Sequence, residues 1–361
     1  MAARREIVET PEVDALIGAP LPREQDILFG HEETERALLD AYRSERFHHA
    51  WILGGPKGIG KATLAFRFAR FVLSHPERFG DAVQSAQSLD VPRTSPVFQQ
   101  VAHGAHPNAL HLRRPWDEKS KRFKSDLPVD EVRRTVSFFG TTASANAWRV
   151  CIVDAADDMN QSSANALLKI LEEPPPRSVF LVLSHAPGRL LPTIRSRCRR
   201  LDMEPLSVTH IGDGVRRFAE NTQDLERDIV DVTKYADGSL RSALILFSGD
   251  GLAIARGFAK LAEEGASRNV KALHGLADLV AVRGQTDNWE SFQHVADRYL
   301  HGLMTGFIRT APPRLDLAKS VTDLWEKFNQ SVRDSDALNL DRKQVVLDLM
   351  LKLSTLKETK R

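Results

Sequence analysis

The chain has 361 residues, enough to bury more than one hydrophobic core, so two or three domains are expected. Apolar residues make up 42% and charged residues 27%, as in ordinary globular proteins, and a formal net charge of +2 argues against a polybasic protein that coats DNA. Two cysteines give no disulfide framework and indicate a reducing compartment. The charged N-terminus does not resemble a signal peptide, and no stretch approaches the ~20 apolar residues of a membrane span. These features predict a cytoplasmic protein without membrane contact.

Three short apolar runs in the first two-thirds of the chain predict buried strands. They cover residues 50–53, 150–153 and 179–183. Helical spacing of apolar residues begins at Leu64, and a second helical face covers residues 164–171 before three prolines stop it. Uninterrupted apolar strands that alternate with helices predict an α/β fold with a parallel sheet covered on both faces.

After about residue 204 only helical patterns remain. Apolar stripes over residues 317–328 and 346–353 predict two long helices near the C-terminus. The expected organisation is an α/β nucleotide-binding-like domain over residues 1–204, a small helical lid over 205–252 and an all-α bundle over 253–361. Within the first domain, residues 75–125 are rich in proline, histidine and basic residues, and we expect a long irregular insertion there.

A phosphate-binding loop is predicted between the first strand and the helix that follows it. Gly55, Gly58 and Gly60 precede Lys61 in the sequence Gly-Pro-Lys-Gly-Ile-Gly-Lys. Glycines let backbone N–H groups converge on phosphate oxygens, the helix N-terminus adds its dipole, and the lysine would reach the β- and γ-phosphates. The alternative is a glycine-rich turn that binds nothing.

The residues that complete an ATP-hydrolysing site are missing. Ala62 stands where a Ser or Thr hydroxyl would ligate Mg²⁺, and the neighbouring Thr63 is rotated by about 100° away from that direction. Asp154 ends the second strand and is a candidate Mg²⁺-binding acid, although such a carboxylate alone could simply cap a strand end. Ala155 follows it where a water-orienting Glu is usual in active motors. We therefore expect no Mg²⁺ site, and a loop that is empty or holds ATP or ADP passively.

Two sequence blocks resemble the clamp-loader subunits of bacterial DNA polymerase III, which are AAA+ proteins. They are the block from Asn165 to Pro175, which contains Leu-Glu-Glu-Pro-Pro, and the block from Leu191 to Cys198. The resemblance covers roughly residues 25–250 and also includes the segment Phe-Gly-His-Glu at 29–32. It implies that Ser196, Arg197 and Cys198 form the motif whose arginine finger reaches the ATP site of a neighbouring subunit.

The same resemblance places two sensor residues, each with a plainer alternative. Ser184 falls at the sensor 1 position and Arg241 at the sensor 2 position, but Arg241 could equally be a surface arginine at a helix start capped by Ser239. Arg197 could likewise belong to a solvated basic run with Arg195 and its neighbours. The four-cysteine zinc module of many family members is absent, since residues 62–149 contain no cysteine, so we expect no structural zinc.

The missing hydroxyl and carboxylate favour the non-motor, delta-prime type of subunit. Such a protein would join gamma or tau and delta subunits in a hetero-pentamer that loads a sliding clamp onto primed DNA, without ATPase activity of its own. Subunits of this type are grouped with the polymerase holoenzyme, so nucleotidyltransferase activity would be theirs only by association. The alternatives are an active ATPase motor of the gamma or tau type, and a small-molecule kinase, which would leave the Ser-Arg-Cys block unexplained.

Overall fold

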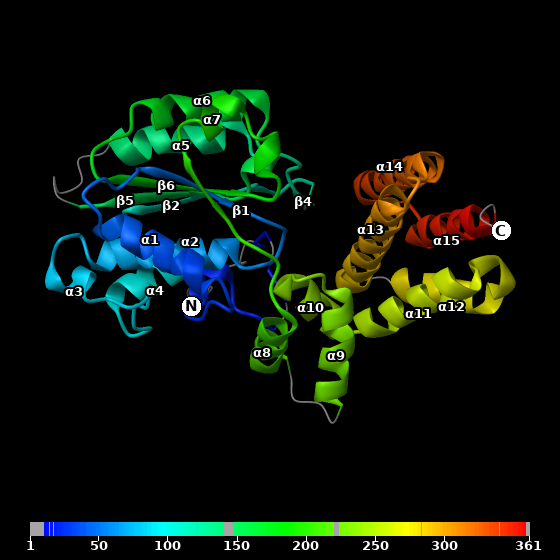
Figure 1. Cartoon of the computed structure of the whole chain (residues 1–361). Coiled ribbons are helices and arrows are strands. Elements are labelled where there is room, and N and C mark those ends of the chain that lie inside the picture. Colours follow the sequence, from blue (N-terminus) through cyan, green and yellow to red (C-terminus); the bar gives the residue numbers. More distant parts are fainter. Residues whose placement is uncertain are drawn as a thin grey trace, which may run out of the picture. The chain divides into compact units, whose positions relative to one another are not determined.

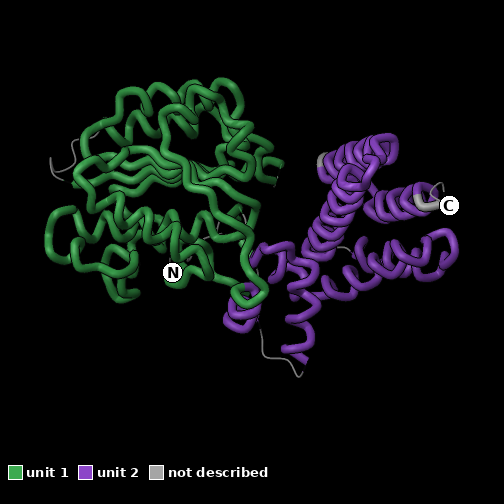
Figure 2. The backbone as a smooth tube through the Cα atoms, in the orientation of Figure 1, with its two compact units in different colours: residues 1–210 green, residues 211–361 purple. Residues whose placement is uncertain are grey.

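The computed structural model describes residues 11–13, 15–16, 18–120, 122–140, 147–219, 224–282, 284–338 and 340–358. The chain forms two compact units, residues 1–210 and 211–361, drawn in different colours in Figure 2. Their boundary lies close to the predicted end of the α/β domain at residue 204. The further division at residue 252 stays a prediction.

The first unit contains a five-stranded parallel sheet in the order β2-β5-β6-β1-β7. Its strands are β1 (Ala50–Gly54), β2 (Ala109–Leu112), β5 (Arg149–Val153), β6 (Ser178–Ser184) and β7 (Arg199–Asp202). Its helices are α1 (Glu32–Arg43), α2 (Lys61–Ser74), α3 (Asp81–Gln84), α4 (Pro96–Ala102), α5 (Val129–Gly140), α6 (Gln161–Glu172) and α7 (Pro192–Arg195), with 3-10 turns at Pro22–Glu24, Ala156–Asp158 and Pro187–Arg189.

Helices cover both faces of this sheet, as Figure 1 shows, with α1 and α2 on one side and α5, α6 and α7 on the other. Side chains of a strand point alternately to the two faces, so β1 contributes Trp51 and Leu53 to one core and Ala50 and Ile52 to the other. This double burial explains why β1, β5 and β6 are uninterrupted apolar runs, and it confirms the predicted α/β class.

The interval 75–125, which the sequence analysis predicts to be irregular, is more ordered than that. It holds α3, α4, the edge strand β2 of the main sheet and a small hairpin of β3 (Trp116–Asp117) and β4 (Arg122–Phe123). The strand β2 was hidden because its residues alternate between buried and half-buried, so it lacks the continuous apolar run of the central strands.

All elements assigned to the second unit are helical. They are the last part of α8 (Val208–Phe218), followed by α9 (Leu225–Tyr235), α10 (Leu240–Phe247), α11 (Gly251–Glu264), α12 (Val270–Val280), α13 (Thr286–Arg309), α14 (Leu315–Leu338) and α15 (Arg342–Glu358), with a 3-10 turn at Ala266–Arg268. The two predicted C-terminal stripes lie on α14 and α15, where Val321 and Phe328, and Val346 and Met350, are buried. Among the described residues no single helix is long and apolar enough to span a membrane, although the bent pair α10 and α11 meets that test jointly.

Candidate functional site: a phosphate-binding loop and a remote arginine

The predicted phosphate-binding loop lies at the carboxyl end of β1 and has the backbone that its glycines permit. Gly55, Gly58 and Gly60 have φ angles of 145°, 78° and 112°, which side-chain-bearing residues rarely adopt. A Cβ atom on Gly55 would lie 2.3 Å from the carbonyl oxygen of Met203, so the loop can pass this point only with glycine. The Gly55 N–H donates to the carbonyl of Ser184 at 3.2 Å and ties the loop to β6.

Lys61 begins α2 and is only 4% exposed. Its Nζ donates to the carbonyl oxygens of Gly55 (2.7 Å) and Pro56 (2.5 Å), so the ammonium lies against the loop itself. The left-handed glycines, the helix N-terminus and this buried cation together make an arrangement suited to the phosphates of a nucleotide.

His31 supports the loop from outside, a role that sequence reasoning did not assign to it. Its Nε2 lies 2.8 Å from the carbonyl oxygen of Ile59, within the loop. Burial lowers the pKa of His31, and the neutral ring that this favours can donate Nε2–H to that carbonyl. The only signal in the sequence was the position of His31 in the family-like segment 29–32.

The carboxyl edge of the sheet also gathers Asp154 and Ser184. In the parallel register Val153 pairs with Val182 and Gly54 with Ser184, so these residues end neighbouring strands beside the loop. Asp154 Oδ2 lies 3.5 Å from His111 Nε2. The structure thus places the predicted loop, the candidate acid Asp154 and the predicted sensor 1 residue Ser184 at the same ends of neighbouring strands.

The hydrolytic accessories are absent in three dimensions as well as in the sequence. Ala62 packs against the hydrophobic core below the loop, and Thr63 is the next residue along α2. Ala155, 7% exposed, supplies no carboxylate after Asp154. These side chains do not fit a magnesium ion at this loop, because neither the hydroxyl nor the second carboxylate is available.

Asp157 is the nearby carboxylate that sequence reasoning left without a role. It accepts hydrogen bonds from the Ser184 hydroxyl (2.9 Å) and from the N–H groups of His185 (2.6 Å) and Ala186 (3.0 Å). Asp157 therefore fixes the turn after β6, and the hydroxyl hydrogen of the buried Ser184 is used in this hydrogen bond. The spacing of Asp154 and Asp157 in the sequence gave no sign of this connection.

Arg197 lies at the opposite, amino end of the strands. The strand β7, which follows it, starts at Arg199, and Arg199 pairs in register with Trp51 near the beginning of β1. The phosphate-binding loop begins after Gly54, three residues further along β1, which is about 10 Å at a rise of about 3.3 Å per residue. Arg197 is therefore not part of the loop's own site.

The Arg197 side chain is partly exposed and held by local contacts. Its Nη1 donates to Thr193 O at 3.0 Å and contacts Ser196 Oγ at 3.4 Å, and its Nη2 lies 2.7 Å from Glu172 Oε1 on α6. Cys198 packs against the core, and burial raises the pKa of its thiol to about 12, so it does not act as a nucleophile at neutral pH. Of the two residues, Arg197 has the more accessible polar group, with a side chain that is 35% exposed.

Arg241 belongs to the second unit. It lies in the first turn of α10, where Ser239 caps the helix by accepting a hydrogen bond from the Ser242 N–H, as the plainer alternative expected. The Arg241 guanidinium pairs with Glu290 at 3.0 Å. Its sensor 2 role stays a prediction.

Metal-binding side chains do not cluster in the described part of the chain, where no group of three or more His, Cys, Asp or Glu residues could hold an ion. Two histidines of the cysteine-free interval 62–149 contact nearby backbone carbonyls. His75 contacts Phe71 O at 3.1 Å and His103 contacts Gln99 O at 2.7 Å, each one helical turn away.

Comparison with known proteins finds relatives that are subunits of DNA polymerase III. Residues 30–207 match the family model described as DNA polymerase III, delta subunit. The DNA polymerase III subunit delta' of Pseudomonas aeruginosa is 39% identical over 150 residues, which are 42% of this chain and 41% of that protein. Subunit delta' of Escherichia coli is 30% identical over 213 residues (59% and 58%), and subunit tau of Bacillus subtilis is 27% identical over 237 residues (63% and 39%). The chain matches roughly two to three fifths of the length of these relatives.

The phosphate-binding loop at the edge of a parallel sheet, the covering helices and the helical unit that follows define a protein of the AAA+ clamp-loader class. Within this class the chain belongs to the delta-prime subunit family of bacterial DNA polymerase III. The predicted family and fold class are confirmed.

Proposed function

We propose that this chain is the non-motor subunit of a bacterial clamp loader and offers Arg197 to the ATP site of an adjacent gamma or tau subunit. In this proposal it joins those subunits and delta in a cytoplasmic hetero-pentamer that places a sliding clamp on primed DNA. The proposal draws on the relatives that are named delta' and tau subunits of DNA polymerase III. Its own loop holds ATP or ADP passively through backbone N–H groups and Lys61.

The observation that carries the proposal is the separation of Arg197 from its own phosphate-binding loop. Because Arg199 pairs with Trp51, Arg197 lies at the amino ends of the strands, whereas Gly55 begins the loop at their carboxyl ends. A planar guanidinium with a permanent charge can stabilise the charge that develops during phosphoryl transfer, but only within contact distance of the phosphates. Arg197 can therefore serve only a nucleotide bound by another subunit.

The same loop argues against the motor alternative. Ala62 and Ala155 remove a metal ligand and a water-orienting carboxylate, and Asp157 is committed to the turn after β6. A motor would need all of these functions at its own loop. Any nucleotidyltransferase activity of the assembly would come from the associated polymerase.

The test is a reconstituted clamp loader containing this full-length chain, motor subunits, clamp and primed DNA. We expect Arg197→Ala to lower the DNA-stimulated ATPase and clamp-loading rates about tenfold or more, because arginine fingers contribute at least that much to catalysis. Arg195→Ala is the matched control, since Arg195 is an exposed arginine on the preceding turn, and it should leave both rates unchanged.

The isolated chain, assayed in parallel, should show negligible Mg²⁺-dependent ATP hydrolysis. Robust turnover by the isolated chain, or equal rates for complexes with Arg197→Ala and wild type, would overturn the proposal.

A further inference from the structure

The guanidinium of Arg197 is held from two independent sides. Thr193 O and Ser196 Oγ, on the same short turn, occupy Nη1, while Glu172 Oε1 occupies Nη2 from a different helix. An arginine has five N–H donors, and these contacts use three of them. Within the described part of the chain, Nε–H and one Nη2 hydrogen remain for another ligand.

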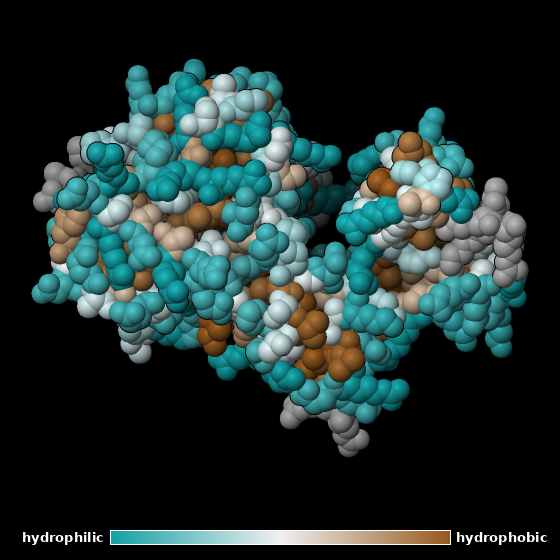
Figure 3. All heavy atoms as spheres, in the orientation of Figure 1, coloured by the Kyte–Doolittle hydropathy of each residue, from teal (hydrophilic) through white to brown (hydrophobic). Residues whose placement is uncertain are grey.

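Glu172 is the last residue of α6, and the packing of that helix sets the position of its backbone. The helix ends there before Pro174 and Pro175, and it packs against α7 through the same core that buries Leu171 and Ile194. The position of the Glu172 backbone is therefore fixed relative to the turn that carries Arg197. Figure 3 shows mostly hydrophilic side chains over α6. The side chains of Arg197 and Glu172 are both partly exposed.

We propose that Glu172 is the positioning residue of the arginine finger: it fixes the Arg197 guanidinium so that Nε–H and the outer Nη2 hydrogen face an incoming phosphate. This inference rests on the proposed function. A free arginine samples many rotamers, and ordering it on subunit contact has an entropic cost that a pre-formed contact reduces. The gain should appear in the rate of phosphoryl transfer, where oriented charge acts.

The alternative is an ordinary surface ion pair. The Arg197 and Glu172 side chains are 35% and 42% exposed, and exposed pairs contribute little to folding stability. A purely surface pair would leave catalysis unchanged when broken. The positioning role predicts instead a loss of catalytic rate with little change in folding stability. The catalytic rate of the variant therefore distinguishes the two explanations.

The experiment uses the reconstituted clamp loader with the full-length chain carrying Glu172→Ala, Glu172→Gln or Glu173→Ala. Glu173 is the matched control, because it is the adjacent exposed glutamate and forms no ion pair that the structure records with Arg197. We expect Glu172→Ala to lower kcat for ATP about threefold to tenfold, the size of one ordered side chain, with KM and the thermal unfolding temperature nearly unchanged. Glu172→Gln keeps an oxygen acceptor at the same place and should recover most of the rate.

A double variant tests whether Glu172 acts on catalysis through Arg197. In an Arg197→Ala background, Glu172→Ala should cause no further loss, because both substitutions remove the same interaction. An additional loss in that background, a Glu172→Ala rate equal to wild type, or a faster rate would each overturn the positioning role. If Arg197→Ala itself has no effect, the proposed function fails and takes this inference with it; if only Glu172→Ala has none, the function stands and the positioning role fails.

Discussion

At residue 62 a methyl group occupies the place of a metal-ligating hydroxyl. Ala62 follows Lys61 on the first turn of α2, so a Thr at this position would direct its hydroxyl toward the β- and γ-phosphate side of the loop. Thr63, one residue further, points about 100° away around the helix. The two positions therefore make a matched pair for testing passive nucleotide binding.

We predict that Ala62→Thr makes ADP or ATP binding respond to Mg²⁺, with affinity about tenfold higher in Mg²⁺ than in EDTA, as expected for one added metal ligand. Wild type should bind equally with or without Mg²⁺, and Thr63→Ala should behave like wild type. Fluorescence titration with a labelled nucleotide measures all three. Neither variant should hydrolyse ATP, because Ala155 still supplies no carboxylate. Binding by wild type that requires Mg²⁺ would contradict this account.

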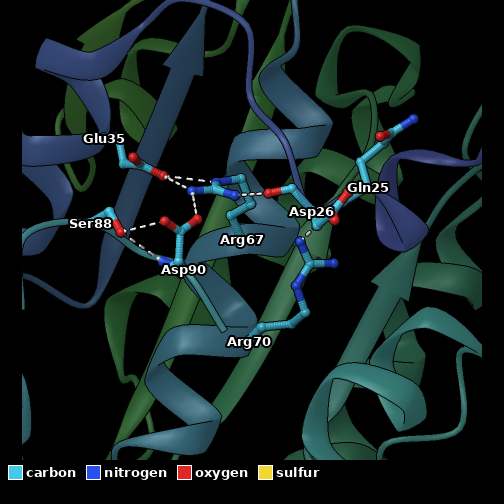
Figure 4. A network of polar contacts seen from close by, with 7 residues as sticks. All are labelled: Gln25, Asp26, Glu35, Arg67, Arg70, Ser88 and Asp90. Carbon is cyan, nitrogen blue, oxygen red and sulfur yellow. Dashed lines mark hydrogen bonds and ion pairs between the residues drawn. The ribbon is translucent and has the colours of Figure 1, made fainter. Parts of the chain in front are cut away.

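At the scale of elements, α2 links the phosphate-binding loop to a partly buried polar network, drawn in Figure 4. Arg67, near the middle of the helix, contacts Glu35 on α1 and Asp90 in the loop before α4 at 2.7 and 2.6 Å, and it also donates to the backbone of Asp26. Arg70, one turn later, donates to the backbone of Arg23 and Gln25, and burial lowers its pKa to about 10. The figure labels the members Gln25, Asp26, Glu35, Arg67, Arg70, Ser88 and Asp90.

Arg67→Ala should destabilise the first unit by about 3 kcal/mol, because it removes the cation that pairs with the largely buried Glu35 carboxylate. The Arg67 side chain is 6% exposed and Glu35 is 14% exposed, so at least this pair is largely shielded from water. Chemical denaturation of the full chain measures the change. Arg36→Ala, an exposed arginine on α1, is the control and should shift stability by less than about 0.5 kcal/mol.

The elements that could be predicted from the sequence are those buried on both sides. The strands β1, β5 and β6 and the helices α2 and α6 carry long apolar patterns, because both faces or a whole stripe meet the core. The edge strands β2 and β7 escaped prediction since one side of each has no neighbouring strand and their residues are partly polar. Edge strands of this kind resemble loops in composition.

The residues of the candidate site also differ in whether the sequence could predict them. The loop glycines and Lys61 could be predicted because phosphate binding demands a contiguous motif. The pairing of Glu172 with Arg197 could not, since the two residues are far apart in the sequence and meet only because α6 and α7 pack together. The Asp157 contact with Ser184 was hidden for the same reason. Hydrogen bonds between separate elements leave no periodic trace in a sequence.

At the scale of the whole molecule, partly buried histidines make the stability of both units depend on pH. Burial lowers the pKa of His31, His49, His106 and His294. His294 shows the cause, because its Nε2 contacts Tyr235 O at 2.9 Å and its Nδ1 contacts the Ser242 hydroxyl at 3.3 Å, a pattern suited to a neutral ring. Between the ordinary histidine pKa of about 6.5 and the lower folded values, the unfolded chain binds more protons than the folded one.

Stability should therefore be fully present above about pH 6.5 and decrease as the pH falls below it. We expect the thermal unfolding temperature to be about 5 °C lower at pH 5.5 than at pH 7.5. His294→Gln removes one of these groups and should reduce the difference between the two temperatures, even if it lowers both. Calorimetry of the full chain at the two pH values measures this, and equal or higher stability at pH 5.5 would contradict it.

Arg197 precedes the start of β7, whereas the phosphate-binding loop follows the end of the neighbouring parallel strand β1, so the two features lie at opposite ends of the strands and give the subunit a direction. Subunits that join head to tail would each present a finger to one neighbour and a nucleotide to the other. A subunit that supplies an arginine finger but does not hydrolyse its own nucleotide interrupts that repetition on one side only. In the proposed assembly such a member lies at one end of the series of ATP-hydrolysing sites. An otherwise repetitive ring therefore has a defined first site and a defined order of the sites that follow it.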